Sequence, residues 1–350
     1  MSVQTEGGQG TDLAGRIGGG MARDTERARD GEPLASGKLR LLVIGLTLAL
    51  VAYLLFILWA GFDEVIAGAA LLSLGDWLLL LGLSLVHFLL RFARWQGYLV
   101  TLGHRVAHGQ SLLCYMSGFA LTTTPGKVGE TVRAVYLKRH GVAVADTFAG
   151  FFAERYTDLI AVVALSMLAI GSYEGNVWPL ILGCGLVLVL LLGLRLPWLP
   201  RMLDAIAERG WAQMGRGALE GLAKMLRSAA QLLGIRQITA ATAIALVAWA
   251  VQGLVLYLVL EMLGFPLPVA IVIGIYALGI LAGALSFLPG GLGSAEAVMI
   301  LMLVVEGLSV TDATTATLIC RIATLWFAVL LGISAMGHLE LRNRFFRSAG

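Results

Sequence analysis

Long apolar runs alternate with short polar connections along most of this sequence. Runs near 20 residues long occur at 41–60, 69–90, 148–170, 177–194, 238–260, 269–287 and 313–337. A helix needs roughly 20 mainly apolar residues to cross the hydrocarbon core of a bilayer. Two further runs, 111–124 and 295–305, are too short to cross and predict re-entrant segments. The pattern therefore predicts an all-α polytopic membrane protein.

The basic residues between these runs predict the orientation. Lys and Arg gather before residue 41, after residue 90, at 127–139, at 195–236 and at 342–347, whereas the connections near residues 63, 174 and 264 have none. Because cytoplasmic loops are enriched in Lys and Arg, both termini are predicted to be cytoplasmic. The run 111–124 then enters from the cytoplasm and returns, while 269–305 enters from outside and returns. We expect about six full transmembrane helices plus two re-entrant hairpins.

The predicted turns of these hairpins resemble each other. Residues 124–130 read Thr-Pro-Gly-Lys-Val-Gly-Glu, and 288–296 read Leu-Pro-Gly-Gly-Leu-Gly-Ser-Ala-Glu. An arginine follows each turn within a span, Arg155 being 30 residues after Pro125 and Arg321 being 32 after Pro289. A repeat with opposite membrane orientation is typical of transporters, although two unrelated Pro-Gly turns would give the same similarity. The predicted turn residues are Pro125, Gly126, Gly129, Pro289, Gly290, Gly291 and Gly293.

Composition agrees with this architecture and sets its limits. Only 13% of residues are charged, against about 25% in soluble domains, and 58% are hydrophobic. Residues 1–37 are too polar to form a core and predict a disordered cytoplasmic tail. After this tail we predict a single transmembrane domain at 38–340 and a basic cytoplasmic tail at 341–350. Within the domain, 200–235 is a basic amphipathic segment, which lies either on the membrane surface or as helices packed on the bundle.

Charged residues inside the apolar runs are the candidate site. A charge at the bilayer centre costs at least about 2.5–3.5 kcal/mol, so it is expected to face a partner or water. Glu154, Arg155 and Asp158 lie in one span, and Arg321, which we expect to pair with Glu296, lies in the last. The first group predicts either an ionic clasp between helices or a polar vestibule for a charged headgroup.

The first turn adds a second group of charges. If a helix begins near Val128, its free N–H groups favour a phosphate, and Lys127 and Arg133 would strengthen that attraction. Glu130 lies between them. Lys127 and Arg133 could equally be ordinary positive-inside charges. Arg91, Arg94 and Trp95 are interpreted as anchors at the cytoplasmic interface.

Motifs for enzyme chemistry are lacking in the sequence. His104 and His108 have i, i+4 spacing without the Glu of a zinc motif, and no nucleotide-binding fingerprint or nucleophile elbow occurs. The cysteines Cys114, Cys184 and Cys320 lie in apolar runs without paired spacing. We therefore predict no cofactor, no metal, no nucleic-acid partner and no enzymatic activity.

Three motifs in order carry a family resemblance. They are Thr-Pro-Gly-Lys-Val-Gly-Glu-Thr-Val-Arg at 124–133, Glu-Arg-Tyr-Thr-Asp-Leu at 154–159 and Leu-Pro-Gly-Gly-Leu-Gly-Ser-Ala-Glu-Ala at 288–297. Together they resemble the lysylphosphatidylglycerol synthase transmembrane family over about residues 40–340. The resemblance implies a flippase-like bundle that moves or presents lipids with charged headgroups. The soluble aminoacyl transferase of the related synthases is expected to be absent, so their synthase activity is not carried over.

By position, the resemblance implies that eight residues meet the lipid headgroup: Lys127, Glu130, Arg133, Glu154, Arg155, Asp158, Glu296 and Arg321. We expect a translocase in a bacterial inner membrane whose partner is a phospholipid or a hopanoid- or polyprenoid-type lipid. A separate lipid-modifying enzyme would be a further partner, and Gly274–Gly283 would pack within one chain or between the chains of a homodimer. The alternatives are an intramembrane enzyme with Glu130 or Glu154 as general base, and a lipid-binding scaffold.

Overall fold

The computed structural model describes residues 66–170, 216–286 and 288–348, with single helical positions at 178, 181 and 185. These residues belong to one compact unit, Ala49–Gly350. The predicted tail 1–37 and the runs 41–60 and 177–194 lie outside the described residues, apart from those single positions. Side chains at 125–128, 170, 216–220, 289 and 343–348 are also outside the description, so Lys127 is placed by its backbone alone.

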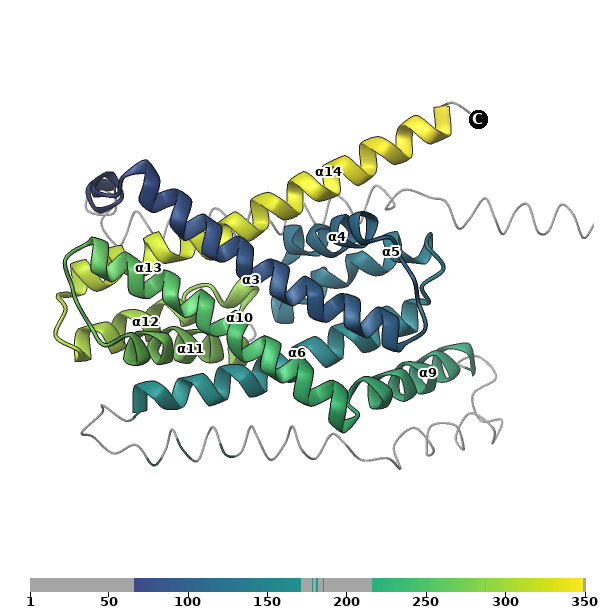
Figure 1. Cartoon of the computed structure of the whole chain (residues 1–350), viewed down its shortest axis with the longest axis horizontal. Coiled ribbons are helices and arrows are strands. Elements are labelled where there is room, and N and C mark those ends of the chain that lie inside the picture. The colour runs from purple at the N-terminus through teal and green to yellow at the C-terminus, as the bar shows by residue number, and fades with distance from the viewer. Residues whose placement is uncertain are drawn as a thin grey trace, which may run out of the picture. The chain divides into compact units, whose positions relative to one another are not determined.

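The described residues are helical and contain no strand, which confirms the all-α prediction. In chain order the elements are α3 (Leu74–Thr101), α4 (His108–Ser117), η1 (Gly118–Leu121), η2 (Pro125–Val132), α5 (Arg133–Lys138), α6 (Val144–Ile170), α9 (Arg216–Leu232), α10 (Ile235–Met262), α11 (Val269–Leu285), η3 (Pro289–Gly291), α12 (Ser294–Val305), α13 (Val310–Arg321), η4 (Ile322–Trp326) and α14 (Phe327–Ser348) (Figure 1).

Three continuous helices in the described part are long and apolar enough to cross a membrane. They are Leu74–Thr101, Ile235–Met262 and Val310–Arg342, the last formed by α13, η4 and α14. The helix α6 has 27 residues and contains the charged turn at 154–158. The predicted total of six spans stays a prediction, because two of the six fall largely outside the described residues. The predicted tail at 341 begins inside α14.

Each predicted re-entrant run forms half of a helical hairpin. In the first hairpin, α4 and η1 lead to a turn near Thr124, and η2 and α5 return. In the second hairpin, α11 leads to η3. Gly290 and Gly291 of η3 and Gly293, just before α12, adopt positive φ angles of 64°, 67° and 85°. Glycine is the residue that adopts this backbone region without strain, so the turn depends on it. Helix α12 then returns along α11.

The tips of the two hairpins touch each other. Elements η2 and η3 are in contact, and a Cβ added to Gly290 would lie 3.2 Å from the Cα atom of Thr123. Segments about 165 residues apart in the sequence therefore meet inside the protein. A binding site that uses residues from the tips of both hairpins would therefore lie at this contact.

The packing of the helices is reciprocal between the two halves. The first hairpin packs against α14, the helix that follows the second hairpin, and the second hairpin packs against α6, the helix that follows the first. The preceding helices, α3 and α10, pack against each other. A two-fold repeat gives matching contacts of this kind in its two halves. The opposite membrane orientation of the halves stays a prediction.

Small residues allow both exchanged contacts to be close. A Cβ on Gly332 of α14 would collide with the backbone nitrogen of Ala120, and one on Gly274 of α11 would collide with that of Ala169. In lipid, no hydrophobic effect draws helices together, so their association depends on close packing. Backbone contact at small residues provides such packing.

The amphipathic helix α9 packs on the start of α6. Ser228 Oγ donates a hydrogen bond of 2.7 Å to Asp146, whose other carboxylate oxygen lies 2.8 Å from His104 Nε2 and 3.7 Å from Lys224 Nζ. Residues 216–232 thus form a helix that packs on α6, while the placement of the segment at the cytoplasmic face stays a prediction.

We predict that Gly332→Ala destabilises the protein and Gly337→Ala does not. Both glycines lie in α14, but a Cβ at Gly337 meets nothing within 4 Å. Overpacking costs typically about 1–3 kcal/mol, whereas Gly to Ala in an open helical position gains up to about 1 kcal/mol. Thermal unfolding of the purified variants in detergent measures both. Equal Tm values would contradict the close contact between α14 and η1.

We also predict that Asp146→Asn lowers the Tm at neutral pH and has little effect in acid. Asp146 precedes the predicted span 148–170, and burial raises the pKa of its carboxyl. Hydrogen bonds from Ser228 and His104 and the charge of Lys224 lower that pKa by more, so the net shift is downward. A lowered folded-state pKa gives stability that is present above the ordinary value near 3.8 and is lost as pH falls through the folded value. A Tm difference between wild type and Asp146→Asn that does not shrink below pH 4 would contradict this assignment.

Candidate functional site

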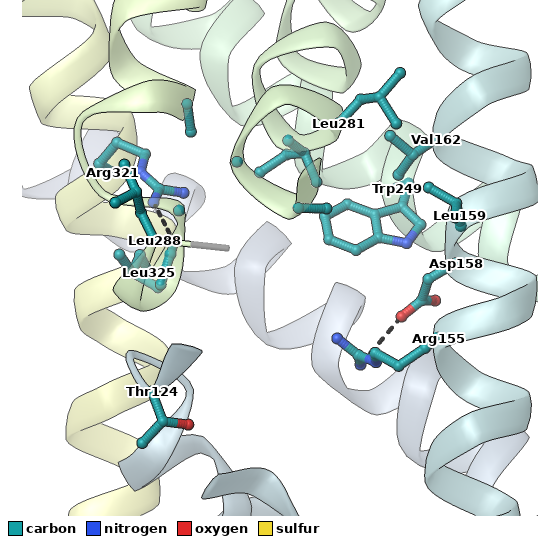
Figure 2. Close-up of a pocket in the computed structure, with 16 residues that line it drawn as sticks. Thr124, Arg155, Asp158, Leu159, Val162, Trp249, Leu281, Leu288, Arg321 and Leu325 are labelled. Carbon is teal, nitrogen blue, oxygen red and sulfur yellow. Dashed lines mark hydrogen bonds and ion pairs between the residues drawn. The ribbon is translucent and has the colours of Figure 1, made fainter. Parts of the chain in front are cut away.

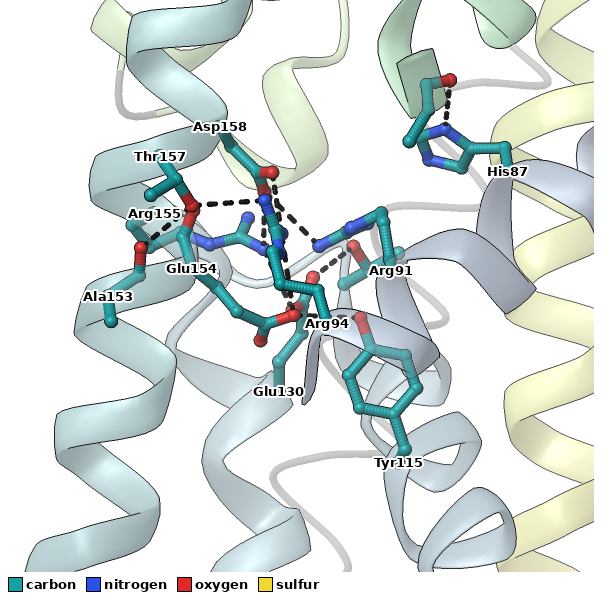
Figure 3. A network of polar contacts seen from close by, with 12 residues as sticks. His87, Arg91, Arg94, Tyr115, Glu130, Ala153, Glu154, Arg155, Thr157 and Asp158 are labelled. Atoms are coloured by element: carbon teal, nitrogen blue, oxygen red, sulfur yellow. Dashed lines mark hydrogen bonds and ion pairs between the residues drawn. The ribbon is translucent and has the colours of Figure 1, made fainter. Parts of the chain in front are cut away.

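A network of buried ion pairs joins α6 to α3 (Figure 3). On α3, Arg94 donates to Asp158 Oδ1 at 2.7 Å and to Thr157 Oγ1 at 3.0 Å. Arg91, one turn earlier, lies 3.4 Å from Asp158 Oδ2. Residues three or four apart lie on one face of a helix, so the i, i+3 arginines of α3 and the i, i+4 acids of α6 face each other.

Glu154 connects this network to the first hairpin. Its carboxylate accepts hydrogen bonds from Arg133 Nη2 at 2.5 Å and from the Tyr115 hydroxyl at 2.8 Å, and Arg94 lies 3.6 Å away. The Arg133 guanidinium also lies over the Trp95 ring, 4.1 Å from its centre. Glu154 is fully buried, so these contacts replace the water that a carboxylate would otherwise bind.

Arg155 points to a different part of the hairpin. Its Nη2 atom lies 3.5 Å from Glu130 and 3.2 Å from Asp158, and 24% of its side chain is exposed. Glu130 also accepts a hydrogen bond of 2.9 Å from Thr122 Oγ1. Arg155 therefore ties the tip of the first hairpin to α6 while remaining partly open.

Positive charge is in excess in this ion cluster, which we define by seven side chains. Four are arginines and three are carboxylates: Arg91, Arg94, Arg133, Arg155, Glu130, Glu154 and Asp158. Removing charge from water is unfavourable unless it is compensated, and here one positive charge exceeds the carboxylates.

The second hairpin has an ion pair of its own. Arg321 Nε donates to Glu296 Oε1 at 2.5 Å, which confirms the predicted pairing of these two residues. Glu296 also accepts from Gly293 N at 2.7 Å and so caps α12, while Arg321 Nη2 lies 3.4 Å from the Gly290 carbonyl oxygen. The chain changes to a π-helical turn, η4, directly after Arg321. Such turns inside α-helices are frequent at functional sites.

The two hairpins use equivalent ion pairs. Glu130 and Arg155 are 25 residues apart in the sequence, and so are Glu296 and Arg321. In each half, the glutamate follows the hairpin tip and the arginine lies on the next long helix. This shared spacing supports the repeat independently of the Pro-Gly motif.

A cavity of about 250 Å³ lies where the tips meet (Figure 2). Arg155 and Asp158 line it from α6, and Arg321 lines it from the opposite side, beside the tip of the second hairpin. Most of the remaining lining is apolar and includes Trp249 and Leu281. A second chamber of about 50 Å³ adjoins this main cavity and shares Arg321 and Trp249 with it.

The structure separates the predicted site residues into groups. Glu130, Arg133, Glu154, Arg155 and Asp158 belong to the ion cluster, and Glu296 and Arg321 form the second pair. Of the eight predicted headgroup residues, Arg155, Asp158 and Arg321 line the described cavities. Of the predicted turn residues, Gly290 and Gly291 do so. Glu154 thus takes part in an ionic clasp between helices, as one of the two interpretations predicts. Arg155 lines the cavity, and the second interpretation, a vestibule for a charged headgroup, stays a prediction.

The prediction that Arg91, Arg94 and Trp95 anchor the protein at the membrane interface is wrong. All three are buried, and both arginines belong to the ion cluster. The first hairpin and α6 cover this end of α3, so it does not face lipid headgroups. The i, i+3 spacing of the two arginines on one helical face was the signal that could have placed them in the site.

Comparisons with known proteins agree with this architecture. The sequence model of the lysylphosphatidylglycerol synthase TM region matches residues 42–332. The chain belongs to this family. A UPF0104 membrane protein of Pyrococcus horikoshii is 23% identical over 334 residues, 88% of this chain and 97% of that protein.

Two further relatives show how widely the family region occurs. A UPF0104 membrane protein of Methanothermobacter thermautotrophicus is 27% identical over 251 residues, 64% of this chain and 72% of that protein. The phosphatidylglycerol lysyltransferase of Staphylococcus xylosus is 30% identical over 120 residues, which are 34% of this chain and 14% of that enzyme. The chain is thus an integral membrane protein of the lysylphosphatidylglycerol synthase TM family.

Proposed function

We propose that the protein is a lipid translocase, which moves or presents a lipid with a charged headgroup across the cytoplasmic membrane of a bacterium. Both termini would lie in the cytoplasm, as the distribution of Lys and Arg predicts. The observation that carries the proposal is the main cavity, where Arg155 and Arg321 line a largely apolar space between two re-entrant tips.

The chemistry of this cavity suits a lipid headgroup. A guanidinium binds phosphate oxygens with paired, charge-assisted hydrogen bonds, and these are stronger away from water. The apolar lining, with residues such as Leu159 and Leu281, suits the part of a lipid next to its headgroup. The acyl chains would remain in the bilayer during movement.

The two ion pairs suggest how the halves would move. Arg321 and Glu296 are buried and 2.5 Å apart, whereas Arg155 and Glu130 are 3.5 Å apart and Arg155 is partly exposed. In a repeat of opposite orientation, exchanging the tight and loose pairs exchanges the side from which the central site is reached. A headgroup anion would replace a carboxylate on one arginine and favour the exchange.

The rival proposal of an intramembrane enzyme has less support. A general base needs a carboxylate within reach of the reacting group. Glu154 is bound by Arg133 and Tyr115, Glu130 is bound by Thr122 and Arg155, and neither lines the described cavities. Guanidinium and hydroxyl donors already occupy the oxygens that would accept a proton.

We predict that Arg155→Gln and Arg321→Gln slow lipid movement in reconstituted vesicles, while Arg236→Gln does not. Arg236 lies exposed in the first turn of α10 and serves as a matched control. A hydrogen bond to a charged group contributes about 1.5–3 kcal/mol, which corresponds to roughly a tenfold to hundredfold loss. The measurement is the rate at which a labelled phospholipid becomes accessible to a quencher outside the vesicle.

Loss of Arg321 alone would leave Glu296 buried without this partner, and misfolding could cause the same loss. The double variant Arg321→Gln with Glu296→Gln removes both charges, so it separates the two causes. Wild-type rates in Arg155→Gln and in this double variant would contradict the site.

We predict that Glu130→Gln and Glu296→Gln shift access to the cavity in opposite directions. A single cysteine at Leu288, which lines the main cavity, would be introduced after replacing Cys114, Cys184 and Cys320 by Ala. A membrane-impermeant thiol reagent then measures labelling from each side of oriented vesicles. Each variant should raise labelling from a different side, because each weakens a different pair. Changes from the same side in both would contradict the alternating mechanism.

A further inference from the structure

The helix α3 contains a buried histidine, His87, inside the predicted span 69–90. His87 is 2% exposed and lines the small chamber beside the main cavity. Ionisable side chains inside membrane spans are rare, and in pumps and transporters they form proton relays. Imidazole is the side-chain group whose charge ordinarily changes between about pH 5 and pH 8. His87 is therefore a candidate for a group that binds and releases a proton.

A contact with α10 determines which nitrogen of His87 would take up this proton. The Nδ1 atom lies 2.7 Å from the carbonyl oxygen of Ala248 (Figure 3). A carbonyl oxygen only accepts hydrogen bonds, so Nδ1 carries a hydrogen and donates it. In the neutral ring the lone pair that binds a proton is then on Nε2. Proton uptake at Nε2 leaves the bond to Ala248 in place, so it changes the charge of the ring without releasing the ring from α10.

The small chamber suits water that would carry protons to His87. Gln252 is 2% exposed, and its Oε1 atom has no hydrogen-bond partner among the described residues. A buried acceptor of this kind indicates a bound ligand or water. The chamber volume of about 50 Å³ exceeds the roughly 10–15 Å³ that one water needs, and Thr122, Tyr276 and Thr324 add hydroxyl groups to its lining. Because the chamber adjoins the main cavity, its water would reach the side to which that cavity opens.

The electrostatic surroundings of His87 are balanced. The other charged and titratable groups in the described lining of the chamber are Arg91 of α3, Tyr276 of α11 and Arg321 of α13. The described residues that α10, η1, η4 and α14 contribute to this lining are uncharged. Asp158 compensates Arg91, and Glu296 compensates Arg321. A proton on His87 would add a charge to this balanced set, so the proton could leave again when the surroundings change.

A charge on His87 would act on Arg91, which follows it by four residues on α3. Residues at this spacing are neighbours on a helix, and like charges there repel. Both side chains also contact Trp249, with 5.0 Å between the ring centres of His87 and Trp249 and 5.8 Å from the Arg91 guanidinium to the Trp249 ring centre. Arg91 and Arg155 lie 3.4 Å and 3.2 Å from the same oxygen, Oδ2 of Asp158. Repulsion of Arg91 would therefore change how firmly Asp158 holds Arg155.

We propose that His87 is the proton-binding site of a proton-coupled translocase. A proton from water on the side to which the main cavity opens binds the Nε2 lone pair. The added charge displaces Arg91 and alters the loose pair of Arg155, and the proton returns to water on the other side after the exchange. No other bond forms or breaks. This inference rests on the proposed function, because it assigns the ion that drives the same movement.

Nuclear magnetic resonance of the full chain in micelles, with ¹⁵N-labelled histidine, tests proton binding. The His87 signal is assigned by its loss in His87→Asn, whose amide nitrogen takes the place of Nδ1 and still donates to Ala248. His140→Asn removes an exposed histidine and is the control. We expect a ring with hydrogen on Nδ1 alone at pH 8 and an imidazolium at about pH 5. A ring whose protonation does not change over this range would overturn the proposal.

Access to the main cavity tests the coupling. In the cysteine-free chain with Leu288→Cys, the labelling from one side is divided by the labelling from the other at pH 6 and at pH 8. This ratio cancels the effect of pH on thiol reactivity. We expect the ratio to change by roughly threefold or more when His87 or the control His140→Asn is present, and to stay constant in His87→Asn. The same change with and without His87 would overturn the coupling.

A pH gradient across vesicles tests whether the proton drives lipid movement. The probe is acyl-labelled phosphatidylglycerol in vesicles of phosphatidylglycerol and phosphatidylcholine, with the membrane potential clamped at zero. One proton per lipid lets one pH unit sustain up to about a tenfold difference in probe between the leaflets. We expect an unequal distribution with the wild-type chain and an equal one with His87→Asn.

Failure of the proton site differs from failure of the proposed function. Probe that crosses at the same rate with and without the gradient, and reaches equal amounts in both leaflets, would retain the translocase and overturn proton coupling. A His87 ring that titrates and controls cavity access, in a chain that moves no labelled lipid, would retain the proton site and refute translocation.

Discussion

The constraint on which this structure depends is the compensation of charge away from water. Arginines on α3 and in the first hairpin can be buried because α6 presents Glu154 and Asp158 one turn apart on the facing side. The same contacts fix the hairpin against two long helices. The ion cluster therefore holds the fold together through pairs between helices that are far apart in the sequence.

The second constraint concerns the backbone at the hairpin tips. Irregular backbone inside a membrane is tolerated only where protein or water satisfies its polar groups. Here Glu296 caps α12, the Thr124 hydroxyl accepts from Gly129 N at 2.7 Å, and the two tips cover each other at Gly290 and Thr123. The tips are therefore stable because they meet, and their meeting creates the cavity. Ion pairs of equal spacing link each tip to the helix that follows it.

Both constraints act on the same two arginines. Arg155 and Arg321 stabilise the tips through glutamates and also line the main cavity. In the proposed mechanism, a ligand anion would compete for the same guanidinium groups and would thereby couple binding to rearrangement of the tips. The small chamber lies on one side of Arg321 and is lined in part by Gln252 and Tyr276.

The sequence by itself determined the helical class, the runs behind the described hairpins, the Pro-Gly turns and the pairing of Arg321 with Glu296. Apolar length, glycine and the unfavourable burial of charge are local properties, so they are readable along the chain. Only the tertiary structure decided that Arg91 and Arg94 are buried, that Glu130 pairs with Arg155, and that Gln252 and Tyr276 line a polar chamber. Each of these contacts depends on which helices pack against each other. The exchanged packing of the two hairpins brings together residues that are far apart in the sequence, so no local sequence pattern predicts it.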